Sequence, residues 1–472
     1  MEITHINRIT HRSTLSIHRF FSVEAILIAW FVSTPILSFF VRYPLDKSVI
    51  TYDRATIGLV IVMLLWKYWS RAKNKPRAKN EPRARSSTGA LPFEIAWALL
   101  AVLMLVNTAV KSGDVGHATR IVIDAFWLPL ALFHIARRHF DMRGKGSALL
   151  LGAVAVGGML FAIGAYEFVT GTDLFHYKGS ELIRAGELRV NGPFASDSSY
   201  AIICLLIAVF LAFTPQALGV RLDRAARLTY GFAIAGSIAA SMLPQFRMVA
   251  AAVAVCWLIF AATGSAQAEW LGKVNHAWRT KRLPLSQLKL HPFTMSVIVL
   301  IALAAVSVLL ASASLGQRLA SLHNVYGRLA TWEAAVRISA ENPLLGVGIT
   351  NYGDYFRAKY FEGEIPVERI IESRAALSPH SNPLWVAAEV GAVAFALYLI
   401  ANVYIFRMGY GALKRAADVR QRAAAACHLA MAVAYWLPGL TLTSGIYSDL
   451  SLYFFFLLGL LANIFQKRLI RY

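Results

Sequence analysis

Long apolar runs recur along this chain, and they constrain its fold more than any other feature. About twelve stretches carry few charged side chains. Each is roughly 16–24 residues long, close to the length that an α-helix needs to cross a bilayer. The candidate spans are 21–41, 48–69, 91–110, 120–137, 147–169, 197–214, 228–243, 248–263, 294–312, 383–406, 425–443 and 447–465. Because backbone amides need internal partners inside lipid, we expect an all-α, polytopic membrane protein with one membrane domain over residues 1–472.

Composition and charge agree with a membrane protein and argue against other classes. Hydrophobic residues make up 57% of the chain and charged residues 15%, whereas an ordinary soluble domain carries about 25% charged residues. The net charge is +21, but Lys and Arg cluster beside the apolar runs, as topology signals and contacts with anionic lipid do. We therefore expect membrane lipid and no nucleic acid as a partner. The densest cluster, residues 67–90, is predicted to be a cytoplasmic loop, which also places both termini in the cytoplasm.

The cysteines and the other metal-ligating residues give no sign of a redox or metal site. Cys204, Cys256 and Cys427 all lie inside apolar runs, so we expect small buried side chains and no disulfide. No group of His, Cys or carboxylate residues has metal-ligand spacing. Neither a metal nor another cofactor is expected.

Two external loops follow from this topology, and both are too long to be simple connectors. They comprise residues 171–196 and 313–382, and long loops often carry function. Within the second loop, residues 326–340 have helical spacing, and Asn342-Pro343 ends the pattern. The apolar residues on one side of this helix are Leu329, Trp332 and Val336. We expect a short helix lying at the outer membrane interface.

Two arginines stand where the outer surface of the membrane is predicted. Arg247 follows a tight turn and opens the eighth span, and Arg328 begins the interfacial helix, four residues before Trp332. Each has an ordinary explanation, an interfacial arginine that reaches lipid phosphate or a polar residue on an amphipathic helix. Together they supply two planar cations suited to bidentate contact with a diphosphate.

His380 lies in the stretch SPHSNPLWVAAEVG, three residues before a predicted span. A single histidine in a loop is commonly only a polar surface residue. Here two prolines, Pro379 and Pro383, predict a rigid turn that fixes the imidazole. A fixed neutral imidazole can remove a proton from a hydroxyl group.

A further group of residues is a candidate for contact with a sugar or an acceptor. In the first external loop, Arg184, Glu187 and Arg189 precede the turn Asn191-Gly192-Pro193-Phe194, where they form either a solvated loop or an acceptor site. Asn382, beside His380, and Tyr352, in the second loop, are added to this group.

Three segments resemble the O-antigen ligase and polymerase superfamily, also called the Wzy-C family. They are RVNGPFASDSSYAI, YGRLATWEAAVRISAENPLLGVGITNYGDYF and SPHSNPLWVAAEVG. The second segment contains an Arg with a Trp four residues later and a Pro-Leu-Leu-Gly-Val-Gly run, and the third joins a His motif to Glu-x-Gly. The resemblance covers about half of the chain, from Arg189 to Gly391.

The resemblance implies a GT-C-like fold with about twelve spans and a large periplasmic loop that contains short interfacial helices. It also implies an inverting, metal-independent glycosyltransferase of the bacterial inner membrane that acts at the periplasmic face. The donor would be a glycan on undecaprenyl diphosphate, and the acceptor a glycan or a lipid core. His380 resembles the catalytic base of the family, and Arg247 and Arg328 resemble the residues that bind the donor diphosphate.

Several functions of this kind remain open. The chain is expected to be an O-antigen ligase or a polymerase of lipopolysaccharide or exopolysaccharide assembly, in the second case with a possible chain-length regulator as partner. A protein O-oligosaccharyltransferase of the same superfamily is the first alternative. A transporter or flippase for the lipid-linked glycan is the second, and Asp124 and Glu389 are then the candidates for charge along its path.

Overall fold

The architecture described here is that of a computed structural model. It describes residues 22–42, 51–74, 91–175, 183–184, 187–188, 190–194, 196–220, 222–263, 323–360 and 378–469.

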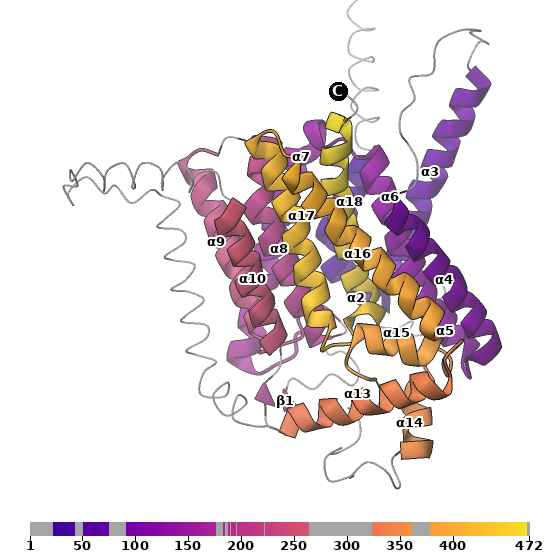
Figure 1. Ribbon diagram of the computed structural model, residues 1–472. Coiled ribbons are helices and arrows are strands. Elements are labelled where there is room, and N and C mark those ends of the chain that lie inside the picture. Colours follow the sequence, from indigo (N-terminus) through magenta and orange to yellow (C-terminus); the bar gives the residue numbers. More distant parts are fainter. Residues whose placement is uncertain are drawn as a thin grey trace, which may run out of the picture.

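These residues form a helical bundle with one short β-hairpin (Figure 1). The α-helices are α2 (Val23–Arg42), α3 (Tyr52–Asn74), α4 (Pro92–Lys111), α5 (Val115–Val122), α6 (Leu128–His139), α7 (Met142–Thr170), α8 (Asp197–Leu218), α9 (Arg224–Met242), α10 (Arg247–Thr263), α13 (His323–Glu341), α14 (Tyr352–Tyr360), α15 (Asn382–Val390), α16 (Ala392–Lys414), α17 (Val419–Gly439) and α18 (Ser448–Leu469). The remaining elements are the π-helical turn η1 (Ile123–Trp127), the 3-10 turn η5 (Ser444–Ile446) and the paired strands β1 (Ile183–Arg184) and β2 (Glu187–Leu188).

Several of these helices are long and apolar enough to cross a membrane, which indicates a multi-pass membrane protein. Five segments of the described chain meet both criteria: Pro92–Lys111, Val115–His139, Gly144–Thr170, Asp197–Leu218 and Ala392–Lys414. Three shorter apolar helices cover Val23–Leu37, Arg247–Thr263 and Ser448–Ile464. The count of twelve spans stays a prediction, and its ninth member, residues 294–312, lies outside the described residues.

The tenth predicted span, residues 383–406, is wrong as a single helix. The chain forms α15 and then α16, and the two helices meet at Gly391. Gly391 has a φ of +95°, which glycine adopts readily and residues with a side chain rarely do. The backbone of Leu344 and Leu345 lies against its Cα, so no side chain fits there. The membrane-spanning candidate therefore begins at Ala392, and α15 precedes it.

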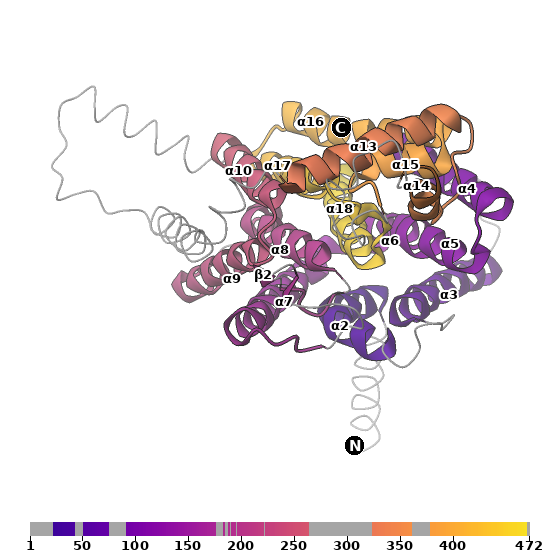
Figure 2. The same cartoon turned by 90° about the horizontal axis from the view of Figure 1, so that it is seen from below.

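Helices α13, α14 and α15 lie across one end of the bundle, which we call the α13 face (Figure 1). Seen from below, α13 crosses this end between α10 and α4 (Figure 2). The expected helix of the second external loop is thus present as α13. Whether it lies at a membrane interface stays a prediction.

The centre of the bundle is formed by α8 and α18. Most of α8 is buried, and it packs against α7, α9, α17 and α18. Helix α18 packs along α6, where Gly459 lies against the carbonyl of Phe133. The amide of Asn463 donates hydrogen bonds to the carbonyls of Arg137 (2.7 Å) and Phe140 (3.0 Å) and so satisfies the end of α6. The three cysteines are buried and free, as predicted.

We predict that Gly391→Ala destabilises the protein by about 1–3 kcal/mol, because alanine is strained at this φ and its Cβ meets the backbone of Leu344. The measurement is the thermal midpoint of the detergent-solubilised protein. Gly58→Ala in α3 is the matched control, since no atom lies within 4 Å of its added Cβ. Equal midpoints for the two variants would contradict the tight junction.

Candidate functional site

The ends of several helices that carry candidate residues meet at the α13 face. Asn382, at the start of α15, bonds to the η5 turn that immediately precedes α18. Phe194, just before α8, packs on Tyr453 near the start of α18, with 6.4 Å between ring centroids. The start of α8 is therefore at this face. The turns from α8 to α9 and from α9 to α10 are short, so the direction alternates and α10 also begins here, at Arg247.

His380 occupies a left-handed turn directly before α15, with a φ of +48°. Its backbone N–H donates to the Ser378 hydroxyl (3.2 Å), and that hydroxyl bonds to the Thr443 hydroxyl (2.8 Å). The imidazole is partly exposed. A non-glycine residue in this conformation needs support from its surroundings, and such positions cluster at functional sites. The turn predicted from the flanking prolines is present.

Asn382 supports this turn and is not presented to a ligand. The side chain is buried, its amide donates to the Ser444 hydroxyl (3.3 Å), and its carbonyl accepts from the Gly445 N–H (2.8 Å). Both ends of the amide are thus engaged within the protein. The arrangement indicates a structural link between α15 and the α17–α18 turn, in place of the predicted contact with a sugar.

The two arginines lie on helices that approach each other at this face. Arg247 is exposed, and the residue two before it, Gln245, closes the turn with a φ of +62°. Arg328 is partly buried in the first half of α13. In both views one end of α13 lies near α10 and the other near α14 (Figures 1 and 2). Because α14 follows the end of α13, the end near α10 is the one that carries Arg328.

Two segments that were identified separately in the sequence are in direct contact. They are Pro343–Gly348 and Glu389–Gly391. The N–H of Val347 donates to the Ala388 carbonyl (3.0 Å), and the N–H of Gly348 donates to the Glu389 carbonyl (2.9 Å). A third bond runs from the Ala392 N–H to the Pro343 carbonyl (2.8 Å). The glycine-containing run therefore lies against the junction of α15 and α16.

Glu389 is the centre of this contact. Its carboxylate oxygens accept the backbone N–H groups of Thr350 (2.9 Å) and Tyr352 (3.1 Å), at the start of α14. A carboxylate at a helix start also complements the helix dipole. Burial raises the pKa of Glu389 to about 7, although the two N–H groups favour the charged form. The side chain is buried with its hydrogen-bonding partners. The transporter hypothesis placed this residue along a transport path, but its carboxylate is bound within the protein.

Asn107, near the end of α4, completes the same contact and was not predicted from the sequence. Its buried amide donates to the carbonyls of Leu345 and Glu389, the latter at 3.1 Å, and its own carbonyl accepts from the Ile349 N–H (3.1 Å). An asparagine in an apolar run was the only available signal. Its partners are more than 200 residues away in the chain, so spacing does not reveal them.

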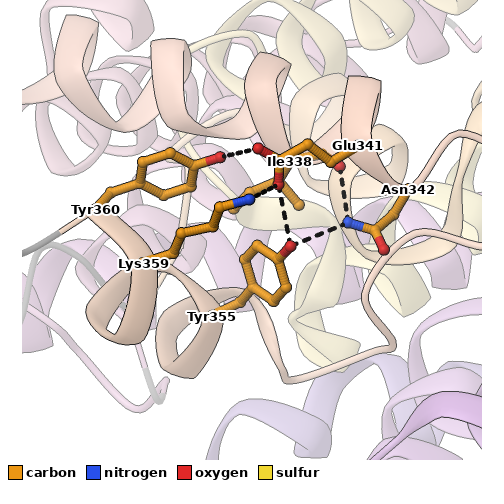
Figure 3. Close-up of polar contacts among 6 residues, drawn as sticks. All are labelled: Ile338, Glu341, Asn342, Tyr355, Lys359 and Tyr360. Atoms are coloured by element: carbon orange, nitrogen blue, oxygen red, sulfur yellow. Dashed lines mark hydrogen bonds and ion pairs between the residues drawn. The ribbon is translucent and has the colours of Figure 1, made fainter. Parts of the chain in front are cut away.

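The far end of α14 is bound to α13 by a second polar cluster (Figure 3). Glu341 pairs with Lys359 (2.6 Å) and accepts from the hydroxyls of Tyr355 (3.0 Å) and Tyr360 (2.9 Å). The hydrogen bond from Lys359 is the main cause that lowers the pKa of Glu341. Helix α14 is thus fixed at its start by Glu389 and at its end by Glu341.

Tyr352 belongs to the packing of this layer. Its ring is fully buried, and its hydroxyl donates to the Thr331 carbonyl (2.7 Å) on α13. Its sequence context had predicted contact with an acceptor or a sugar. As placed, the side chain joins α14 to α13 and offers no ring face to a ligand.

The first external loop is described only in part. Arg184 and Glu187 lie opposite each other in the backbone register of strands β1 and β2, and Arg189 lies outside the described residues. Glu167, near the end of α7, is buried and accepts the N–H groups of Asn191 (3.2 Å) and Gly192 (2.8 Å). This loop is therefore bound to the bundle in the same manner as the second loop.

Asp124 has a charged partner. Arg54 donates to both of its carboxylate oxygens, each at 2.7 Å, and the pair links α3 to the π-helical turn η1. Such bidentate pairs are strong and geometrically specific. The second charge considered for a transport path is thus part of a link between helices.

Comparison with known proteins leaves the family open. No family model and no curated protein matches this chain. The resemblance to the O-antigen ligase and polymerase superfamily stays a prediction.

We predict that Glu389 makes stability depend on pH. A carboxyl whose folded-state pKa is above its ordinary value of 4.5 stabilises the fold while protonated, so this contribution is complete below about pH 4.5. It is lost as the pH rises through about 7. Thermal midpoints across this range should fall more steeply for the wild type than for Glu389→Gln, which does not titrate. Parallel curves would contradict the raised pKa.

Proposed function

We propose that this protein is a membrane glycosyltransferase that moves a glycan from undecaprenyl diphosphate to an acceptor hydroxyl. The observation that carries the proposal is the position of His380, in a strained and supported turn at the face where α10 and α13 bring Arg247 and Arg328. A base and two cations at one end of an apolar bundle fit a reaction on a lipid-linked diphosphate.

In this mechanism His380 accepts the proton of the acceptor hydroxyl. The acceptor oxygen forms a bond to the anomeric carbon while the bond from that carbon to the diphosphate oxygen breaks. Attack opposite the leaving group inverts the anomeric configuration. The partly exposed imidazole on a fixed turn can meet an acceptor that arrives from solution.

The arginines act on the other reactant. Undecaprenyl diphosphate leaves with additional negative charge on the oxygen that bonded the sugar, and the guanidinium groups of Arg247 and Arg328 stabilise it. Both residues lie on helix segments, which restrict where their guanidinium groups reach. No step in this proposal uses a metal or a cofactor.

The lipid part of the donor needs an apolar surface that leads to the α13 face. Val102, Val106 and Val110 are exposed one turn apart on α4, which ends at that face. Helix α16 packs beside α4 and exposes Val393 and Ile400. These residues suit contact with a polyprenyl chain and with the surrounding lipid. We further propose a GT-C-like membrane domain in the bacterial inner membrane, with both termini in the cytoplasm and the α13 face in the periplasm.

The acceptor decides between ligase, polymerase and protein transferase, and the described residues favour none of the three. For the transporter alternative, the relevant observation is that Asp124 and Glu389 both have partners within the protein. We therefore rank transferase above transporter.

We predict that His380→Ala abolishes transfer, with a loss of about 10²–10⁴ in rate, because the base is removed. The measurement is the glycan on undecaprenyl diphosphate in cells, compared with cells that lack the protein. Single repeat units on the carrier indicate a polymerase, and long chains on the carrier indicate a ligase or a protein transferase.

His117→Ala is the matched control, since His117 is exposed and lies at the start of α5, which follows the end of α4 at the α13 face. It should retain activity at wild-type protein levels. Retained activity of His380→Ala, or an unchanged carrier pool in cells without the protein, would contradict the proposed function.

We predict that Arg328→Ala weakens binding of undecaprenyl diphosphate about tenfold or more, because one charged contact to phosphate is lost. Binding to the purified protein in detergent is the measurement. Arg337→Ala, on the same helix but in an exposed ion pair with Glu333, is the control and should bind normally. Equal losses for the two variants would indicate only a general charge effect.

A further inference from the structure

Helix α15 is nine residues long, and its two ends are bound to different parts of the protein. His380 lies two residues before it, and Glu389 lies one residue before its end. A helix this short does not contain enough turns to be stable alone, so its position depends on these attachments.

At its start, α15 is attached to the turn between α17 and α18. Asn382 bonds to Ser444 and Gly445, and the neighbouring hydroxyl of Ser378 bonds to Thr443. Both contacts lie within two residues of His380, and neither involves α13 or α14.

At its end, α15 is attached by hydrogen bonds to α14 and through it to α13, on which Ala388 of α15 also packs directly. Glu389 accepts the N–H groups at the start of α14, and Tyr352 of that helix donates to the Thr331 carbonyl of α13. Thr331 is three residues after Arg328, and its hydroxyl donates to the Arg328 carbonyl (2.9 Å). A continuous series of hydrogen bonds thus runs from Glu389 to the segment that carries the donor-binding arginine.

We propose that Asn382 and Glu389 are positioning residues with separate tasks, Asn382 for the His380 turn and Glu389 for the α13 segment that carries Arg328. This inference rests on the proposed function and deepens it. It assigns placement of the base and placement of the donor diphosphate to opposite ends of one short helix.

Because the two tasks are separate, the two alanine variants should each change a different kinetic parameter. Asn382→Ala leaves the donor site in place and loosens the base, so kcat should fall about tenfold or more while the donor KM changes less than about twofold. Glu389→Ala removes the two hydrogen bonds that fix the start of α14 and so loosens the α13 segment bonded to Tyr352, so the donor KM should rise about tenfold while kcat changes less than about twofold. A direct measurement of undecaprenyl diphosphate binding in detergent should show weakening for Glu389→Ala only.

Conservative variants separate positioning from a general loss of folding. Asn382→Asp keeps the acceptor for the Gly445 N–H, and Glu389→Gln keeps an acceptor for one N–H at the start of α14. Each should recover part of the parameter that its alanine variant loses. They also provide the test if an alanine variant fails to fold. Glu333→Gln, on the exposed side of α13, is the control and should change neither kcat nor KM.

The outcomes distinguish this inference from the proposed function. A lower kcat for Asn382→Ala alone and a higher donor KM for Glu389→Ala alone, with partial recovery in the conservative variants, support the separate tasks. If both alanine variants lower kcat and raise KM together, or if neither changes them while His380→Ala is inactive, the inference is overturned and the transferase proposal stands. If His380→Ala remains active, the transferase proposal itself fails.

Discussion

A main-chain N–H group that is buried outside a helix needs a hydrogen-bond acceptor, and at the α13 face buried side chains provide it. Glu389 accepts two backbone N–H groups of the second external loop, and Glu167 accepts two of the first. Two asparagine side chains, Asn107 on α4 and Asn382 on α15, make further hydrogen bonds to backbone groups of neighbouring segments. An unsatisfied buried group of this kind costs about 1–3 kcal/mol, so non-helical chain at the end of an apolar bundle depends on such residues.

This constraint explains why the candidate site is built on short elements. The junction at Gly391 lets α15 leave the direction of α16, and the run Pro343–Gly348 fills the space beside it. The carboxylate of Glu389 then fixes where α14 begins. A continuous span through residues 383–406 would have left no backbone free for these contacts. The break in the helix and the layer of α13 and α14 are therefore parts of one arrangement.

The sequence predicted the helical class, most helix positions and the presence of α13, because apolar length and helical spacing are local signals. It did not reveal the break at Gly391, since the residues on both sides are apolar and a single glycine is a weak signal. It also missed Asn107, whose partners are distant in the chain, and it assigned ligand contacts to Asn382 and Tyr352, which are buried. The turn at His380 was predictable because its flanking prolines mark it, while a role of His380 in chemistry stays a prediction. Residue type indicated polarity, but only packing decides which polar groups face one another.

The burial of all three cysteines has a practical consequence for finding which side of the membrane the α13 face occupies. Cys204, Cys256 and Cys427 lie within α8, α10 and α17, where water-soluble maleimides do not reach them. The protein without introduced cysteines should therefore not react with these reagents while it is folded. A single cysteine introduced at exposed Leu344 or Val336 would report the compartment of the α13 face in intact cells, without removal of any native cysteine.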